Sequence, residues 1–327
     1  MFWAGCEGGH FDSNREYFNM RIQARLLAVA LSAAFTAPAW ACSICRCGDP
    51  TFNALGKEGV SQSGLRIALD WDQVKKTQGD PKDDFDSLRE RRETLLLAYG
   101  FSPELSLIAR VPYSQRNLTE SRGGELEQTS YSGFADPEVY GQMRLWSSAF
   151  EGSVGIRSSL YLVAGIKTAW GENNATANGA RLDEHVQPGT GSTDGFAGLS
   201  GSYQMNPRSA LFASVQYRRT GRNAFHYHYG NARLFNIAYE HKIGARWDAV
   251  IEANYRNAGC DEINTAGTRD PNTGGSITYL TPRILFDLGK GWILRASSQF
   301  PLYQSGLNGH QEEKAVLNLG VTHVFLP

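Results

Sequence analysis

The sequence lacks an apolar run long enough to cross a membrane as a helix. Such a helix needs about 20 apolar residues, whereas the longest run here, Leu26–Phe35, spans only ten. The mean hydropathy of the chain is also low, at −0.37. A helical membrane protein is therefore excluded.

The sequence also lacks an excess of charge of either sign. Lys and Arg number 32 and Asp and Glu 33, for a net charge of −1. A nucleic-acid-binding domain normally carries a basic footprint, which is missing here. Disorder is excluded by 16 Phe, 14 Tyr and 7 Trp, because disordered chains are poor in aromatic residues. The 35 glycines in 327 residues exceed the usual share of about 7% and, with these aromatics, favour a large antiparallel sheet.

The first 41 residues have the features of an export signal. Arg21 and Arg25 precede the apolar stretch, and the small residues Ala39 and Ala41 flank Trp40 before Cys42. This is the pattern of a cleaved secretory signal peptide. Because Met20 directly precedes Arg21, residues 1–19 are interpreted as an upstream extension, and the mature chain is expected to start at Cys42. Residues 42–63 then form a periplasmic or plug segment, and residues 64–327 the main domain.

From Gly64 onward, apolar and polar residues alternate with a period of two, as in half-buried strands. Trp247, Ile251 and Tyr255 fall on one face of such a segment, and Asp248 and Glu252 on the other. Twelve segments of this kind are predicted: 64–75, 89–101, 103–116, 134–147, 153–170, 194–206, 208–222, 229–243, 246–258, 276–289, 291–304 and 312–326.

The connections between these segments alternate in length. Short links, such as those at Asn206-Pro207 and Gly289–Gly291, alternate with long polar links near 76–88, 117–133, 171–193, 222–229, 259–275 and 305–311. Outer-membrane barrels have short periplasmic turns, long outer loops and aromatic girdles, and aromatic residues such as Tyr99, Trp170 and Trp292 lie at segment ends here. The sequence therefore predicts an all-β transmembrane antiparallel barrel of about twelve strands, with a soluble two-sheet sandwich as the alternative.

Three stretches resemble motifs of one family of outer-membrane proteins. They are Tyr131–Tyr140 with its Ala-Asp-Pro-Glu core, Leu162–Thr168 with Gly165 and Lys167, and Val186–Asp194 with its Gln-Pro-Gly-Thr-Gly-Ser core. Together they resemble the transporter family named for the MetA pathway of phenol degradation, although Ala169 stands where the family has Pro. The resemblance extends over Ser132–Met205 and implies a porin-like channel of the bacterial outer membrane.

One face of the predicted strands carries many ionisable side chains. Burying them in a dry core would be costly, whereas a hydrated pore accommodates them. The predicted pore-lining residues are Arg66, Asp70, Arg110, Arg144, Arg157, Lys167, Glu240, Asp248, Glu252, Arg256, Arg283, Asp287 and Arg295. Bases outnumber acids eight to five in this set. Two interpretations remain open: a polar pore that mildly favours anions, or Arg–carboxylate ladders that fill and close the lumen.

Three cysteines, Cys42, Cys45 and Cys47, lie within six residues of each other. Clustered thiolates suit soft metals such as copper or zinc, whereas the oxidising periplasm favours a disulfide within 42–47 or to Cys260. Lipidation of Cys42 is a third possibility. The segment also offers a docking site for a periplasmic partner.

The pair His226 and His228 would share one face of a strand and is a possible metal site, although contacts at the membrane interface or in a loop are the commoner role. A barrel hydrolase would need a Ser–His–acid set, and neither His241 nor His323 has an obvious Ser partner by spacing. We therefore expect no enzyme, but a channel for small solutes of hydrophobic, aromatic or anionic character, embedded in outer-membrane lipid. The alternative is a metal-binding or redox-linked outer-membrane component that uses the cysteine segment.

Overall fold

The computed structural model describes residues 63–79, 85–122, 125–149, 156–271, 273–305 and 312–325. The predicted signal peptide and the predicted segment 42–63, except for Ser63, lie outside these residues. None of the described residues forms a helix of the length and apolarity that crossing a membrane requires.

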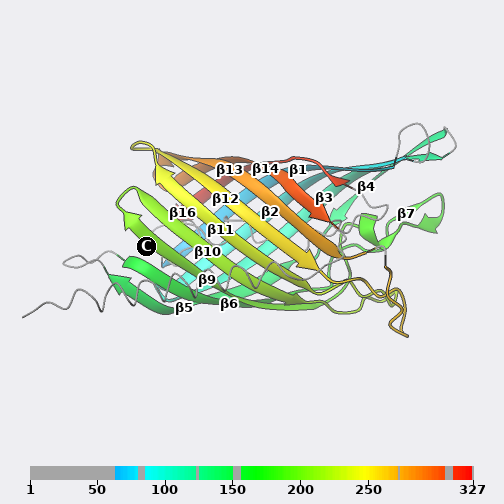
Figure 1. Ribbon diagram of the computed structural model, residues 1–327, viewed down its shortest axis with the longest axis horizontal. Helices are drawn as coiled ribbons and strands as arrows, with labels where there is room; N and C mark the ends of the chain where they lie inside the picture. Colours follow the sequence, from blue (N-terminus) through cyan, green and yellow to red (C-terminus); the bar gives the residue numbers. More distant parts are fainter. Residues whose placement is uncertain are drawn as a thin grey trace, which may run out of the picture. The chain divides into compact units, whose positions relative to one another are not determined.

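Twelve strands of the described chain form one closed antiparallel barrel (Figure 1). The strands, in their order around the wall, are β1 (Gly64–Gly79), β2 (Phe85–Ser102), β3 (Leu105–Arg122), β5 (Glu138–Ala149), β6 (Ile156–Lys167), β9 (Asp194–Asn206), β10 (Ser209–Arg219), β11 (Ala232–Lys242), β12 (Trp247–Ala258), β13 (Gly275–Gly289), β14 (Trp292–Ser305) and β16 (Val316–Phe325). The barrel closes because β1 pairs with β2 on one side and with β16 on the other. The predicted fold class is confirmed.

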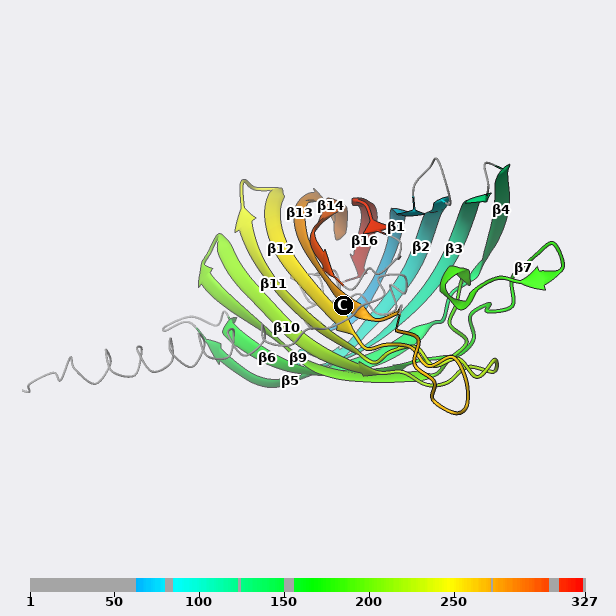
Figure 2. The ribbon, with the colours of Figure 1, turned by 45° about the vertical axis from the view of Figure 1, so that its right-hand side comes forward.

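Short elements decorate one end of the barrel. β4 (Glu125–Phe134) pairs with the outer part of β3, and β15 (Glu312–Glu313) pairs with β1. β7 (Thr176–Ala177) and β8 (Ala180–Arg181) form a small hairpin. A 3₁₀ turn follows, η1 (Glu184–Val186), in which the Asp183 carboxylate accepts a hydrogen bond from the backbone amide of His185. β4 and β7 project from the same end in both ribbon views (Figures 1 and 2). The opposite end carries short turns such as Pro207-Arg208.

The alternation read from the sequence corresponds to the two faces of the wall. On β12, Trp247 and Ile251 point outward and are exposed, whereas Asp248 and Glu252 are buried inside the barrel. Exposed large apolar side chains recur on the outer face of every barrel strand, as expected of a surface that lies against lipid. The interior carries its own apolar clusters, the larger of which comprises Ala68, Leu96, Ala98, Ile108, Tyr140, Val163 and Phe196.

Two of the predicted long polar links are largely strand rather than loop, and this part of the prediction is wrong. The β1–β2 pairing continues to Gly79 and Phe85, and the β3–β4 pairing to Arg122 and Glu125. Apart from the buried Leu88 and Leu118, these segments carry mainly polar residues on both faces, so no sustained period-two hydrophobic pattern marks them. Cross-strand hydrogen bonds satisfy the backbone there regardless of side-chain polarity. The predicted strands 153–170 and 229–243 are also shorter in the structure, as β6 and β11.

We predict that a charge on the outer face will destabilise the barrel according to its depth. Ile237 is 56% exposed at the centre of β11, and Ile243 is 61% exposed just beyond the end of the same strand. Ile237→Arg should lower the free energy of unfolding in lipid vesicles by about 2–4 kcal/mol, and Ile243→Arg by about 0–1 kcal/mol. Equal losses in denaturant titrations of the two variants would contradict this placement of the lipid-facing surface.

Candidate functional site

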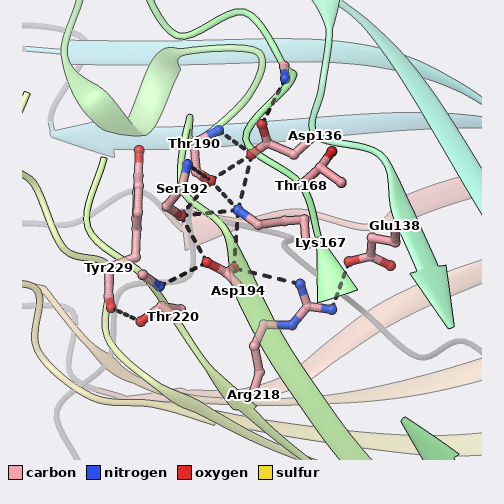
Figure 3. Close-up of polar contacts among 12 residues, drawn as sticks. Asp136, Glu138, Lys167, Thr168, Thr190, Ser192, Asp194, Arg218, Thr220 and Tyr229 are labelled. Atoms are coloured by element: carbon pink, nitrogen blue, oxygen red, sulfur yellow. Dashed lines mark hydrogen bonds and ion pairs between the residues drawn. The ribbon is translucent and has the colours of Figure 1, made fainter. Parts of the chain in front are cut away.

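Lys167, the last residue of β6, lies at the centre of a buried polar network near the looped end of the barrel (Figure 3). Its side chain is 3% exposed, and its Nζ lies 3.1 Å from Asp136 Oδ2 and 3.1 Å from Asp194 Oδ2. The ammonium also donates to the hydroxyls of Thr190 and Ser192. Two carboxylates and two hydroxyls thus surround a single buried cation, which compensates for its desolvation.

Asp136 extends this network to the backbone of the long loop 168–193. Its carboxylate accepts hydrogen bonds from the amides of Gly171 (2.9 Å) and Thr190 (2.7 Å). A Cβ at Gly171 would lie 2.6 Å from the Asp136 backbone nitrogen, so a larger residue cannot fit without a backbone shift. The loop is therefore fastened to the wall at both of its ends. The three motifs behind the family resemblance meet at this point.

Arg218 on β10 continues the chain of charges along the wall. Its guanidinium lies 2.7 Å from Glu138 Oε1 and 3.8 Å from Asp194 Oδ2, and it stacks over the ring of Phe196 at 4.8 Å. Glu138 is also 3.3 Å from Arg110. Cations and carboxylates therefore alternate from β3 to β10. Figure 3 shows the part of this chain that runs from Asp136 through Lys167, Asp194 and Arg218 to Glu138.

A second group of charges fastens the opposite side of the loop. Glu90 lies 2.7 Å from Arg92 and 3.3 Å from Arg116, and it accepts a hydrogen bond from Ser114. Arg116 in turn donates to the carbonyl oxygen of Gln187 in the loop. Next to this contact, Val186 packs on Leu88 and Leu118. The loop is thus attached by both polar and apolar contacts.

The outermost part of the site is a cluster of aromatic rings and acids in the loops. The Tyr227 hydroxyl donates to Asp261 Oδ2 at 2.7 Å and lies 2.8 Å from His185 Nε2. Burial raises the pKa of Asp261 above its ordinary value, although His185 and Tyr227 partly offset this. Tyr229 joins the loop by donating to the backbone oxygen of Glu184.

Glu262 and Arg222 form a neighbouring pair in the same outer loops, with 2.7 Å between them. Partial burial raises the pKa of Glu262, but His228 and Arg222 outweigh it and lower that pKa below its ordinary value. The carboxylate therefore stays ionised and can hold the two loops together.

The structure places the predicted pore-lining residues in three groups. Asp70 and Arg295 form a buried pair at 2.6 Å, Glu252 and Arg283 another at 3.4 Å, and Arg110 and Lys167 belong to the network above. Glu240 and Asp248 are buried, and Arg66 and Arg256 half-buried, at inward positions. The rest lie toward the turn end, where Arg144 pairs with Glu104 and Arg157 and Asp287 are exposed. That these side chains line a pore stays a prediction.

The sequence-based set missed several charged residues of the network. Asp136, Glu138 and Asp194 stood in the motifs but were not assigned to the interior, while Glu90, Arg116 and Arg218 were not singled out. Arg218 shares the inward parity of Phe212 and is 1% exposed, so strict alternation along β10 could have identified it.

The two histidines of the possible metal site do not share a strand, contrary to the prediction. His226 is exposed in a turn with φ of 65°, and His228 is half-buried, 3.3 Å from Glu262. Within the described ranges, no group of three His, Cys, Asp or Glu side chains could hold a metal ion. Copper or zinc at Cys42, Cys45 and Cys47 concerns residues outside those ranges, and Cys260 is a half-buried free thiol.

His241 has a serine partner that spacing did not reveal. Its Nδ1 lies 2.9 Å from Ser209 Oγ, because the two residues face each other across β10 and β11. The other contact of this ring is the Tyr239 hydroxyl. The acid that a Ser–His–acid triad requires is not among these contacts.

Comparison with known proteins places the chain among barrel proteins. Residues 84–316 match the model of a family described as the putative MetA pathway of phenol degradation. The fold is similar to an outer-membrane channel from Pseudomonas putida F1, at 12% identity, 83% coverage of this chain, 98% of that chain and a TM-score of 0.63. A toluene transporter of Ralstonia pickettii, TbuX, aligns at 11% identity, 85% and 98% coverage and a TM-score of 0.45. A search of the curated proteins finds no match.

We predict that Lys167 keeps the loop 168–193 attached to the barrel wall. Lys167→Met leaves the Asp136 and Asp194 carboxylates without their shared cation, and loss of one partner of a buried ion pair costs about 3–5 kcal/mol. Amide hydrogen exchange in the loop should therefore accelerate strongly. The control is Lys314→Met, which breaks an exposed 2.7 Å pair with Glu312 and should change exchange little. Unchanged exchange in Lys167→Met would contradict the prediction.

Proposed function

Because the chain belongs to the family described as the putative MetA pathway of phenol degradation, we propose that it is a passive channel for small solutes. The protein is a β-barrel of the bacterial outer membrane, with an apolar outer face and a charged interior. The observation that carries the proposal is the placement of the interior charges. The ion pairs described above run along the wall.

The ion pairs join strands that lie close together around the barrel. Arg110 and Glu138 lie on β3 and β5, and Arg283 and Glu252 on β13 and β12, which are adjacent strands. The most widely separated of these pairs, Arg218 on β10 with Glu138 on β5, joins strands three places apart, and Asp70 on β1 lies two places from Arg295 on β14. Arg–carboxylate ladders that closed the lumen would have to connect strands on opposite sides of the barrel. This geometry supports a polar pathway bordered by paired charges.

The balance of these charges favours weak selectivity. Bases outnumber acids eight to five in the predicted lining set. Adding the newly placed charges, the acids Glu90, Asp136, Glu138 and Asp194 and the bases Arg116 and Arg218, gives ten bases and nine acids. A channel with so little net charge should discriminate only mildly between anions and cations. Solute size and the outer loops would then decide what passes. The proposal leaves no role for a catalytic group.

We predict stepwise conductance from the full-length, detergent-folded protein in planar lipid bilayers. Under a KCl gradient the reversal potential should show a small anion preference. Arg256→Gln removes a half-buried inward cation on β12 and should reduce that preference. Arg246→Gln, an exposed residue of the β11–β12 turn, should leave it unchanged. A folded protein that gives no conductance would rule out the channel.

A further inference from the structure

A cavity lies on the inner face of the barrel wall. It is at the end of the barrel that carries the short turns, away from the Lys167 network. It has a volume of about 330 Å³ and lies between β6, β9, β10 and β11. Its lining includes the cations Arg157, Arg208 and Lys242 and the acid Glu240. Short turns of outer-membrane barrels face the periplasm, so the cavity is placed at the periplasmic mouth of the channel.

The charge of this cavity is mainly positive. Lys242 ends β11, and Arg208 lies in the β9–β10 turn. Within the described residues neither cation makes an ion pair, although Asp248 faces Lys242 in the strand register. The third cation, Arg157, donates to the Tyr203 hydroxyl at 2.8 Å. Two cations of the lining are thus available to an anion.

The inner side of the cavity is aromatic. Phe212 is 8% exposed and Tyr161 is 2% exposed, and both rings line the cavity. The Tyr161 hydroxyl is buried and has no hydrogen-bond partner among the described residues. A buried hydroxyl without a partner costs free energy unless a ligand or water satisfies it. This group therefore points independently to a polar occupant.

We propose that this cavity binds a small carboxylate with an aromatic body. Arg208 and Lys242 hold the carboxylate, the Tyr161 hydroxyl donates a hydrogen bond to the ligand, and the rings of Tyr161 and Phe212 cover its apolar part. The volume of the cavity falls at the lower end of the range typical of small-molecule sites, about 300–1,000 Å³. The inference rests on the proposed channel function, because it names the solute class that the channel would bind on its way through.

The test measures dissociation constants by titration calorimetry on the full-length, detergent-folded protein with three probes. Benzoate has both the ring and the charge, benzyl alcohol the ring alone, and acetate the charge alone. We expect benzoate to bind at least about tenfold more tightly than either of the others, the effect of one charged hydrogen bond or one buried ring. Equal affinity for the three probes, or no benzoate binding, would overturn the proposal.

Variants locate the site. Lys242→Gln, Arg208→Gln and the conservative Tyr161→Phe should each weaken benzoate binding by about tenfold. Arg246→Gln removes a cation from the same end of the barrel outside the cavity and should bind as the unaltered protein does. A loss in Arg246→Gln equal to that in Lys242→Gln would show general charge attraction and overturn the assignment. Heat-modifiability on gels checks that each variant is folded.

Conductance separates this inference from the channel function. Protein that conducts KCl but does not bind benzoate would overturn the binding site and leave the channel standing. Protein that binds benzoate but never conducts would overturn the channel and leave the site as a binding cavity.

Discussion

The hydrogen bonds between β1 and β16 close the sheet, and the rest of the structure depends on this closure. Lipid offers no partner for backbone N–H and C=O groups, so a sheet in a membrane can have no open edge. Once the first and last barrel strands pair, alternate side chains along each strand must face either lipid or the enclosed interior. The apolar exterior and the charged interior both follow from this one requirement.

Closure also explains why so many buried charges are tolerated. Asp70 and Arg295 lie on strands separated by β16 and far apart in sequence, and only the closed wall brings them within 2.6 Å. Paired along the wall, such charges offset part of the free-energy cost of their desolvation through mutual attraction.

The two ends of the barrel differ in structure and in charge. At the looped end, Lys167 and Asp136 fasten a long loop to the wall, so the entrance is shaped by a fixed element. At the turn end, Lys242 and Tyr161 border a cavity with positive charge and aromatic walls. In the proposed channel, a solute would meet a shaped opening at one end and the proposed carboxylate-binding cavity at the other.

The sequence by itself determined the fold class, the outward and inward faces of the strands and most strand positions. Period-two alternation is local, and residues such as Trp247 and Asp248 reveal it without knowledge of their neighbours. The prediction of strands from this alternation failed where both faces are mainly polar, as in the outer parts of the β1–β2 and β3–β4 pairs. No difference in hydrophobicity between the two faces marks a strand there. Only the tertiary structure decided which inward charges meet. Lys167 contacts Asp136 and Asp194 because strand register and closure bring distant segments together, and no spacing along the chain encodes that distance.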